Sequence, residues 1–195
     1  KTTLVQKLSA YLNARAFYEE FSDNPFLPKF YSDPEKHAFP LELSFLAERY
    51  HQLKNELNSR DLFHKSIISD YYLSKSLIFA EINLPEDEFN LYNSLFSIIH
   101  QKLPKPSLYI YLYSDVDRLQ INIKARGRAY EMEIEDSYLA QIQESYLLFI
   151  NQQTDFPVLL LNTTKIDFVN SVSDFESIVS CLNKEYSKGV HRIML

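Results

Sequence analysis

Glycine, cysteine and long apolar runs are all scarce in this chain of 195 residues. The single cysteine, Cys181, excludes an internal disulfide framework and fits a reducing compartment, so we expect a cytoplasmic protein. No apolar run reaches the roughly 18 residues that a membrane-spanning helix needs, and no signal peptide is visible, so no membrane partner is expected. The net charge of −6 argues against a nucleic-acid partner.

One of the only two glycines, Gly127, lies between Arg126 and Arg128. A helical pattern over residues 116–126 precedes it and another over 136–150 follows, so Gly127 is predicted to end the first helix. Two guanidinium groups near a helix end suit the binding of a polyphosphate. The alternative is a solvated helix end at which an arginine pairs with a nearby glutamate.

Lys1, Thr2 and Thr3 lead directly into a helical stripe of apolar residues. A lysine followed by a threonine at a helix start matches the end of the phosphate-binding loop G-x-x-x-x-G-K-[ST]. On this interpretation Lys1 reaches the ATP phosphates and the Thr2 hydroxyl binds Mg²⁺, both at a helix N-terminus. A first strand and a glycine-rich loop would then be missing upstream of Lys1.

Apolar residues make up 46% of the chain, with 14 tyrosines and 14 phenylalanines, which is enough for the core of one domain over residues 1–195. Hydrophobic periodicity predicts strands that alternate with helices. Such alternation favours a parallel sheet flanked by helices. The predicted strands cover residues 16–18, 66–69, 108–113 and 158–161, and the predicted helices cover 37–57, 71–82, 85–99, 116–126, 136–150 and 174–186.

Two details of these helices are predicted as well. Pro40 is expected in the first turn of the helix over 37–57, where proline is tolerated. Ser114 is expected to be the N-cap of the helix over 116–126.

Adjacent carboxylates follow the first predicted strand, at Glu19 and Glu20. The carboxyl ends of parallel strands are where open α/β sheets hold their chemistry, so one of these groups is a candidate general base. Glu42 and Arg49 are seven residues apart and therefore share one flank of the helix over 37–57.

Taken in order, these segments resemble the deoxynucleoside kinase family, in particular its bacterial deoxyadenosine/deoxyguanosine kinase branch. The resemblance implies a P-loop nucleoside kinase-like fold, a three-layer α/β structure with a parallel sheet of about five strands whose first strand is missing here. It is carried by Lys1-Thr2-Thr3, residues 18–27, Phe30-Tyr31, residues 39–42, Arg49, residues 66–70, Pro104-Lys105-Pro106, and Arg126-Gly127-Arg128 with Glu131.

The resemblance also implies roles for individual residues, with ATP and Mg²⁺ as cofactors. Glu19 matches the family's general base for the 5′-hydroxyl, with Glu20 as the second choice. Arg126 and Arg128 match the lid arginines, which neutralise the phosphoryl group in transfer. Nucleoside-binding positions are matched by Tyr31 and Glu131 at the sugar 3′-hydroxyl, by Arg49 and Asp70 at the base edge, and by Phe21, Phe39 and Phe45 as apolar walls.

Two positions depart from the family pattern. The family has Glu/Asp-Arg-Ser where this chain has His64-Lys65-Ser66. Lys65 would keep the catalytic charge that contacts phosphate and the general base, while His64 replaces an acid near the magnesium. Glu42 stands where the family has the glutamine that pairs with the base, and an ionised glutamate only accepts hydrogen bonds.

The expected function is ATP-dependent phosphoryl transfer to the 5′-hydroxyl of a deoxynucleoside, with a preference for purines, in nucleotide salvage. A homodimer is expected through the helix over 86–99, for which plain core packing is the alternative. A second hypothesis is a non-catalytic kinase-like domain that binds nucleotides or a partner, possibly fused behind a folate-pathway pyrophosphokinase. A third is a nucleoside monophosphate kinase, which would need a basic pocket that residues 37–57 do not provide.

Overall fold

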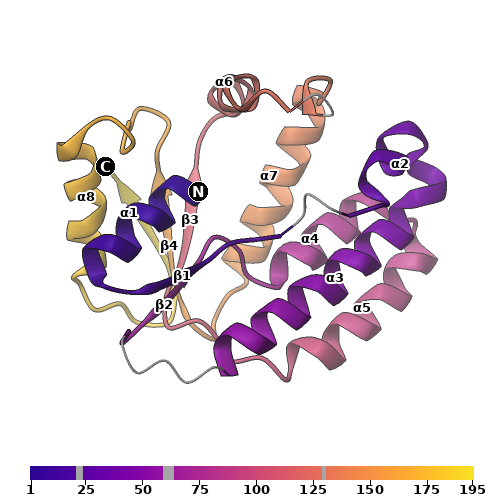
Figure 1. Ribbon diagram of the computed structural model, residues 1–195, viewed down its shortest axis with the longest axis horizontal. Helices are drawn as coiled ribbons and strands as arrows, with labels where there is room; N and C mark the ends of the chain where they lie inside the picture. The colour runs from indigo at the N-terminus through magenta and orange to yellow at the C-terminus, as the bar shows by residue number, and fades with distance from the viewer. Residues whose placement is uncertain (21–23, 59–63, 129–130) are drawn as a thin grey trace. The chain divides into compact units, whose positions relative to one another are not determined.

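The computed structural model describes residues 1–20, 24–58, 64–128 and 131–195, and these divide into two compact units. The N-terminal unit consists of Thr2 and residues 4–104, and the C-terminal unit consists of Lys1, Thr3 and residues 105–195. Each unit has its own parallel sheet and its own helices, which Figure 1 labels. The single domain over 1–195 stays a prediction.

The N-terminal unit contains two short strands among five helices in its described residues. Strands β1 and β2 pair in parallel, with Phe17 opposite Ser69, so the residues that follow them leave the same edge of the sheet. The elements in chain order are α1 (Thr2–Leu12), β1 (Arg15–Phe17), α2 (Leu27–Ser32), α3 (Pro34–Asn58), β2 (Ile67–Ser69), α4 (Ser74–Asn83) and α5 (Glu86–His100).

Helices α3, α4 and α5 lie side by side and enclose the core of the N-terminal unit (Figure 1). Leu46 and Leu53 of α3 recur on one face and are almost fully buried, as are Leu73 and Tyr92 from the chain around α4 and α5. The helix predicted over 37–57 is therefore confirmed, but it begins earlier, at Pro34. Pro40 consequently lies inside the helix and not in its first turn as predicted. Pro34 takes the first position, where a missing N–H costs nothing.

The C-terminal unit is built on a three-stranded parallel sheet in the order β3-β4-β5. Strand β4 is its apolar centre, with Val158, Leu159 and Leu161 fully buried. The ring of Tyr111 on β3 stacks on Tyr146 of α7, with centroids 5.3 Å apart, which packs that helix against the sheet. The elements are β3 (Tyr109–Tyr113), α6 (Val116–Arg126), α7 (Asp136–Asn151), β4 (Pro157–Asn162), α8 (Val172–Leu182) and β5 (Gly189–Met194).

All four predicted strands are present, and the structure adds β5, which was not predicted. Strand β5 lies at the edge of its sheet and carries His191 and Arg192 in place of an apolar run. Edge strands commonly carry charge because one side stays unpaired, so the apolar signal of a buried strand is missing. Helix α2 was not predicted either, and α8 ends at Leu182, four residues before the predicted end.

The ends of α6 confirm one predicted signal and correct another. Gly127 caps the C-terminus of α6 in the left-handed conformation, with φ of 70°, which confirms the prediction that Gly127 ends this helix. The N-cap is Asp115, whose side chain accepts a hydrogen bond from the Arg118 N–H, and not Ser114 as predicted. The Ser114 hydroxyl lies 3.0 Å from that of Thr163, because the preceding strand points it into the unit. None of the helices in the described ranges is long and apolar enough to cross a membrane.

Candidate active site

Glu19 and Asp70 lie at the carboxyl edge of the β1-β2 sheet, in the N-terminal unit. Glu19 follows β1 by two residues, and Asp70 follows β2 directly. The backbone N–H of Glu19 donates a hydrogen bond of 2.9 Å to Oδ1 of Asp70, which ties the two strand ends together. The structure therefore places Glu19 and Asp70 at the carboxyl ends of the strands, where open α/β sheets have their active sites.

Two cations hold the carboxylate of Glu19, one on each oxygen. Nε and Nη2 of Arg49 both lie 2.7 Å from Oε1, and Nζ of Lys75 lies 2.6 Å from Oε2. The side chains of Glu19 and Arg49 are only 8% and 5% exposed. The two cations thus offset the charge of a carboxylate that is shielded from solvent.

Arg49 is fixed from several sides. Its Nη1 donates a hydrogen bond of 2.8 Å to the Ser76 hydroxyl on α4, and its guanidinium lies 4.7 Å from the ring centroid of Phe45. Phe39, another predicted apolar wall, packs against the core of the N-terminal unit, while Phe21 lies outside the described residues. Arg49 thus contacts the general-base candidate in the described structure, and its predicted contact with the nucleoside base stays a prediction.

Asp70 contacts the first residue of α1. Its Oδ2 accepts a hydrogen bond of 2.7 Å from the Thr2 hydroxyl, while its other oxygen holds the Glu19 backbone. Within the described residues, Asp70 and Arg49, the pair expected at the base edge, each contact Glu19. Asp70 thereby joins the predicted metal-binding hydroxyl to the predicted general base.

Lys65 lies two residues before β2, at the end of that strand opposite to Asp70, and it is exposed. His64 lies at the same end. The lysine that contacts Glu19 is Lys75, in the first turn of α4. Lys75 was not predicted from the sequence; it lies between Ser74 and Ser76, both of which are buried.

Glu20, the second choice for the base, is exposed and lines a different feature. It borders a shallow pocket of about 520 Å³ whose other walls come from α3 and include Glu48, His51 and Gln52. The contrast with Glu19, which is buried between two cations, favours Glu19 as the base.

Glu42 is buried on α3 with one unpartnered oxygen. Its Oε1 accepts a hydrogen bond of 2.7 Å from Nδ2 of Asn83, while its Oε2 has no partner among the described residues. Burial raises the pKa of Glu42 above its usual range, against the opposing effects of the Asn83 hydrogen bond and the charges of Arg49 and Lys75. A protonated glutamic acid both donates and accepts, as glutamine does.

The Tyr92 hydroxyl completes this buried polar layer. It lies 3.4 Å from the backbone oxygen of Glu42 and 3.2 Å from that of Ser76, and burial raises its pKa. Tyr31, the other predicted nucleoside-binding residue of this unit, lies on α2 and is 42% exposed. Its ring meets that of Phe30 edge to face.

In the C-terminal unit, Arg126 and Arg128 both pair with Glu131. Nη2 of Arg126 lies 2.6 Å from one carboxylate oxygen of Glu131, and Nη1 of Arg128 lies 3.1 Å from the other. The Glu131 side chain is 10% exposed, whereas those of Arg126 and Arg128 are 49% and 33% exposed. Arg126 and Arg128 flank Gly127, whose left-handed conformation ends α6.

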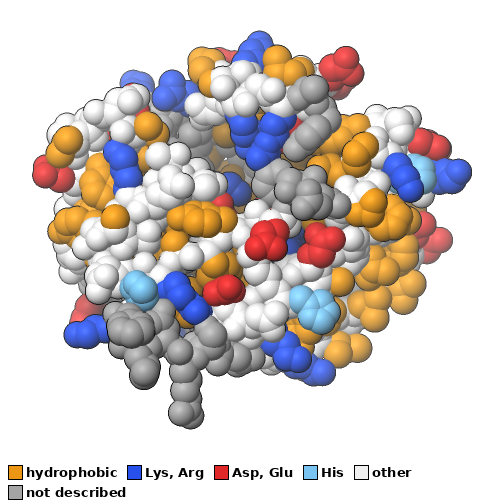
Figure 2. All heavy atoms as spheres, in the orientation of Figure 1, with side chains coloured by type: hydrophobic (Ala, Val, Ile, Leu, Met, Phe, Trp, Pro, Cys, Tyr) orange, Lys and Arg blue, Asp and Glu red, His pale blue; other side chains and the backbone are white. Residues whose placement is uncertain are grey.

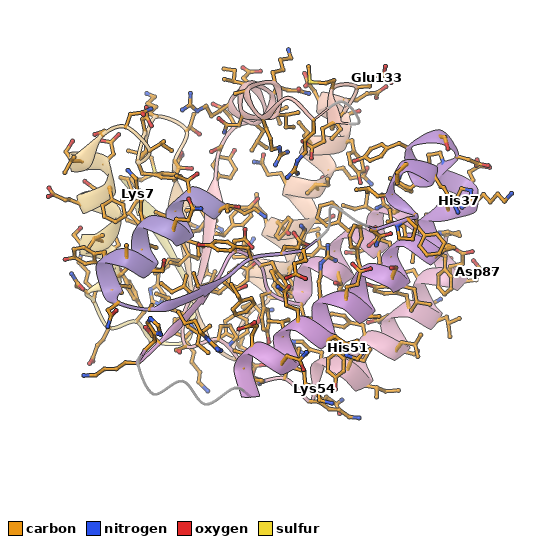
Figure 3. The ribbon with its side chains drawn as sticks, viewed as in Figure 1. Lys7, His37, His51, Lys54, Asp87 and Glu133 are labelled. Carbon is orange, nitrogen blue, oxygen red and sulfur yellow. The ribbon has the colours of Figure 1, made fainter. Side chains whose placement is uncertain are left out.

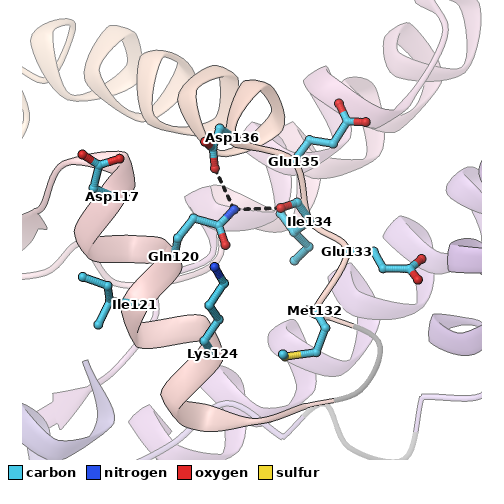
Figure 4. Close-up of a pocket in the computed structure, with 9 residues that line it drawn as sticks. All are labelled: Asp117, Gln120, Ile121, Lys124, Met132, Glu133, Ile134, Glu135 and Asp136. Atoms are coloured by element: carbon cyan, nitrogen blue, oxygen red, sulfur yellow. Dashed lines mark hydrogen bonds between the residues drawn. The ribbon is translucent and has the colours of Figure 1, made fainter.

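A second shallow pocket, also of about 520 Å³, lies between α6 and the start of α7 (Figure 4). Nε2 of Gln120 spans it with hydrogen bonds of 2.8 Å to the Ile134 backbone oxygen and to Asp136. Among the described residues that line it, Lys124 is the only cation, beside Asp117, Glu133, Glu135 and Asp136. None of the predicted site residues lines this pocket.

Comparisons with known proteins identify the family. The sequence model of the deoxynucleoside kinases matches residues 1–186. The chain belongs to the deoxynucleoside kinase family. It is 36% identical to the deoxyguanosine kinase of Bacillus subtilis (strain 168), over 92% of this chain and 89% of the relative. It is 30% identical to the deoxyadenosine/deoxycytidine kinase of the same organism, over 92% of this chain and 84% of the relative.

Solved structures agree with the sequence comparison. The deoxyadenosine kinase from M. mycoides with bound dATP is 26% identical, with a TM-score of 0.79 over 94% of this chain and 93% of that chain. The fold is therefore the α/β fold of P-loop deoxynucleoside kinases, with parallel sheets flanked by helices, and the chain is an enzyme of this family.

Proposed function

We propose that this deoxynucleoside kinase transfers the γ-phosphoryl group of ATP to the 5′-hydroxyl of a deoxynucleoside, with Glu19 as general base. The observation that carries the proposal is the Glu19 carboxylate at the carboxyl edge of the sheet, held by Arg49 and Lys75 in a member of this family. As the O5′–phosphorus bond forms, the bond from that phosphorus to the β–γ bridging oxygen breaks and ADP leaves. The hydroxyl proton passes to Glu19.

The N-terminus of α1 supplies the proposed phosphate site. Lys1 would meet the ATP phosphates beside the free N–H groups of the first turn, where a helix favours anions. The Thr2 hydroxyl and the Asp70 carboxylate are oxygen donors 2.7 Å apart, which fits the preference of Mg²⁺ for one or two protein oxygens alongside phosphate. Bound there, Mg²⁺ would offset phosphate charge during transfer. Asp70 would then supply the acidic group near Mg²⁺ that the family has at the position of His64 in this chain.

Arg126 and Arg128 are proposed to offset the charge on the transferring phosphoryl group. Both now contact Glu131, so a phosphate would compete with one carboxylate for two guanidinium groups. Arg128 lies three residues before Glu131, and its contact with Glu131 is longer than that of Arg126. Glu131 released in this way becomes an acceptor for the sugar 3′-hydroxyl, the role proposed for it together with Tyr31.

Base recognition is proposed to involve Glu42 and Arg49, with a preference for purines. By their names, one relative acts on deoxyguanosine, one on deoxyadenosine and deoxycytidine, and one on deoxyadenosine. Membership of the family therefore does not fix which base is recognised. The neutral form of Glu42 offers one donor and one acceptor at its carboxyl group. A purine presents donor and acceptor groups side by side, which suits such a partner.

The decisive experiment measures ADP release from ATP and Mg²⁺ with deoxyadenosine, deoxyguanosine, deoxycytidine and thymidine in turn. Turnover with one or both purines is expected, and turnover with none of the four would overturn the proposed function. Glu19→Gln should lower kcat by about 10²–10⁴-fold, since that is the usual contribution of a general base, while nucleoside binding by calorimetry stays near wild type. Glu20→Gln, an exposed neighbour, separates loss of the base from loss of local charge.

A further inference from the structure

The side-chain amide of Gln52 bridges the two strand ends that carry Glu19 and Asp70. Its Nε2 donates a hydrogen bond of 2.6 Å to the backbone oxygen of Tyr18, the residue before Glu19. Its Oε1 accepts a hydrogen bond of 2.6 Å from the hydroxyl of Tyr71, the residue after Asp70. One side chain of α3 therefore contacts the neighbours of both carboxylates of the proposed site.

The two partners fix the direction of this amide. A backbone carbonyl only accepts hydrogen bonds, so Nε2 of Gln52 has to face Tyr18, and Oε1 is left to accept from the Tyr71 hydroxyl. Tyr71 is only 7% exposed, so water competes little for the second bond. The amide is therefore matched to both partners in one orientation, and an amide turned over would oppose two oxygens at Tyr18.

Tyr71 is held on its other sides as well. Its ring meets that of Phe17, the last residue of β1, edge to face with centroids 5.8 Å apart. Its backbone N–H donates a hydrogen bond of 3.2 Å to the Ser69 hydroxyl, which donates one of 2.7 Å to the Tyr71 backbone oxygen. These contacts close a turn around Asp70, so a shift of Tyr71 would also shift Asp70.

Helix α3 contacts the chain at Glu19 at two points. Arg49 and Gln52 are three residues apart and are therefore neighbours on the surface of the helix. Arg49 contacts the Glu19 carboxylate, and Gln52 contacts the carbonyl of the peptide bond that leads into Glu19. Leu53, next to Gln52, is 2% exposed and anchors this part of α3 in the core. The helix thus supports both the side chain and the backbone of the proposed base.

We propose that Gln52 is a positioning residue of this kinase, which sets the separation of Glu19 and Asp70 by holding the residues beside them. This inference rests on the proposed function, because the separation matters for transfer only if Glu19 is the base. The hydrogen bond of 2.9 Å from the Glu19 N–H to Oδ1 of Asp70 spans the gap concerned. A displacement of about 1 Å can cost about a hundredfold in rate, so a small movement here reaches the chemistry.

The first measurement is the distance from the Glu19 nitrogen to Oδ1 of Asp70 in crystal structures of the wild type and of Gln52→Met. Methionine keeps the length of the side chain and removes both hydrogen bonds of the amide. The distance should grow from 2.9 Å to beyond about 3.5 Å, the limit of a hydrogen bond. This measurement does not depend on activity.

The second measurement is steady-state kinetics with the preferred deoxynucleoside, well below the Tm of each variant. Gln52→Met should lower kcat by about tenfold, with the KM of the nucleoside and of ATP within about threefold of wild type, because Gln52 is proposed to touch neither substrate. Tyr71→Phe should lower kcat by about threefold. The double variant should lose no more than Gln52→Met alone, since methionine already removes the contact with Tyr71. A residue that only stabilises the fold would leave the kcat of the folded enzyme unchanged.

Asn55→Leu is the matched control, because it removes an amide three residues further along the same helix. Asn55 is exposed, as is its neighbour Lys54, which projects away from α3 (Figure 3). Its loss should leave both kcat and the distance between Glu19 and Asp70 in place. If Gln52→Met does not fold, Gln52→Leu is measured in the same two ways.

The outcomes separate the two hypotheses. A distance that stays near 2.9 Å, an unchanged kcat in both Gln52→Met and Tyr71→Phe, or an equal loss of kcat in Asn55→Leu overturns the role of Gln52. A wild-type protein without transfer to any deoxynucleoside overturns the proposed function, and the distance still decides whether Gln52 sets the separation of the two strand ends.

Discussion

At the scale of single residues, the site is a buried layer of charge in which only some groups are compensated. Glu19 receives a cation on each oxygen, whereas Glu42 receives one amide hydrogen bond and its Oε2 has no partner in the part of the chain that the structure describes. Both carboxyl groups are shielded from water, so the difference lies in their partners. The charge of Glu19 is offset by two cations, whereas burial raises the pKa of Glu42.

A raised pKa at Glu42 predicts how stability depends on pH. A carboxyl group whose pKa is higher in the folded state stabilises the fold below its unfolded pKa, near 4.5, and loses this contribution as the pH rises through the folded value. Glu42→Gln removes the titration and should be more stable than wild type at pH 7.5, by about 1–3 kcal/mol. The gain should shrink toward pH 4.5.

Urea unfolding of both proteins at the two pH values measures this difference. Glu81→Gln, the same change at an exposed site on α4, is the matched control and should alter stability little at either pH. A gain at Glu42 that stays constant with pH would show that the carboxyl group does not take up a proton on folding.

At the scale of elements, the turn after α6 determines where the two arginines lie. Gly127 has φ of 70°, and a Cβ built there would meet nothing closer than the Lys124 backbone oxygen at 4.0 Å. The space is therefore open, and the need for glycine is conformational. The turn brings Arg126 and Arg128 to one carboxylate, so strain at this position should reach the proposed lid charges.

Gly127→Ala is expected to destabilise the protein by about 1 kcal/mol, because alanine resists the left-handed conformation. For a chain of this length, that change corresponds to a fall in Tm of about 2–4 °C. Gly127→Asn is the matched variant, since asparagine tolerates this conformation, and it should recover most of the loss. Calorimetry that finds Ala and Asn equally stable would show that backbone strain at this turn is unimportant.

The elements also show which parts of the fold the sequence can predict. Helices α3 and α6 follow from apolar spacing and from Gly127, and β4 follows from its apolar run, because burial of a whole face leaves a periodic signal. Strand β5 carries charge at a sheet edge and lacks that signal. Lys75 was missed for a different reason: spacing identifies the buried face of a helix, but not which distant carboxylate a lysine beside that face will meet.

At the scale of the whole molecule, one apolar surface remains to be explained. Leu91, Leu95 and Ile98 recur at spacings of four and three on α5 and are 55%, 36% and 58% exposed. They lie on a different flank of α5 from Tyr92 and Phe96, which are buried in the core of the N-terminal unit. Figure 2 shows apolar side chains gathered over this helix at the right of the view. Contiguous exposed apolar surface is a feature of protein interaction sites.

We therefore expect a homodimer through α5, with a mass by light scattering of about 46 kDa, twice the 23.0 kDa of one chain. Ile98→Glu and Leu91→Glu should each shift the protein toward the monomer, because a buried unpaired charge opposes association. Leu148→Glu is the matched control, since Leu148 is a similarly exposed leucine on α7, 57% exposed, and should leave the mass unchanged. A wild-type mass near 23 kDa at all concentrations would contradict the dimer. Equal dissociation by the Leu148 variant would locate the interface away from α5.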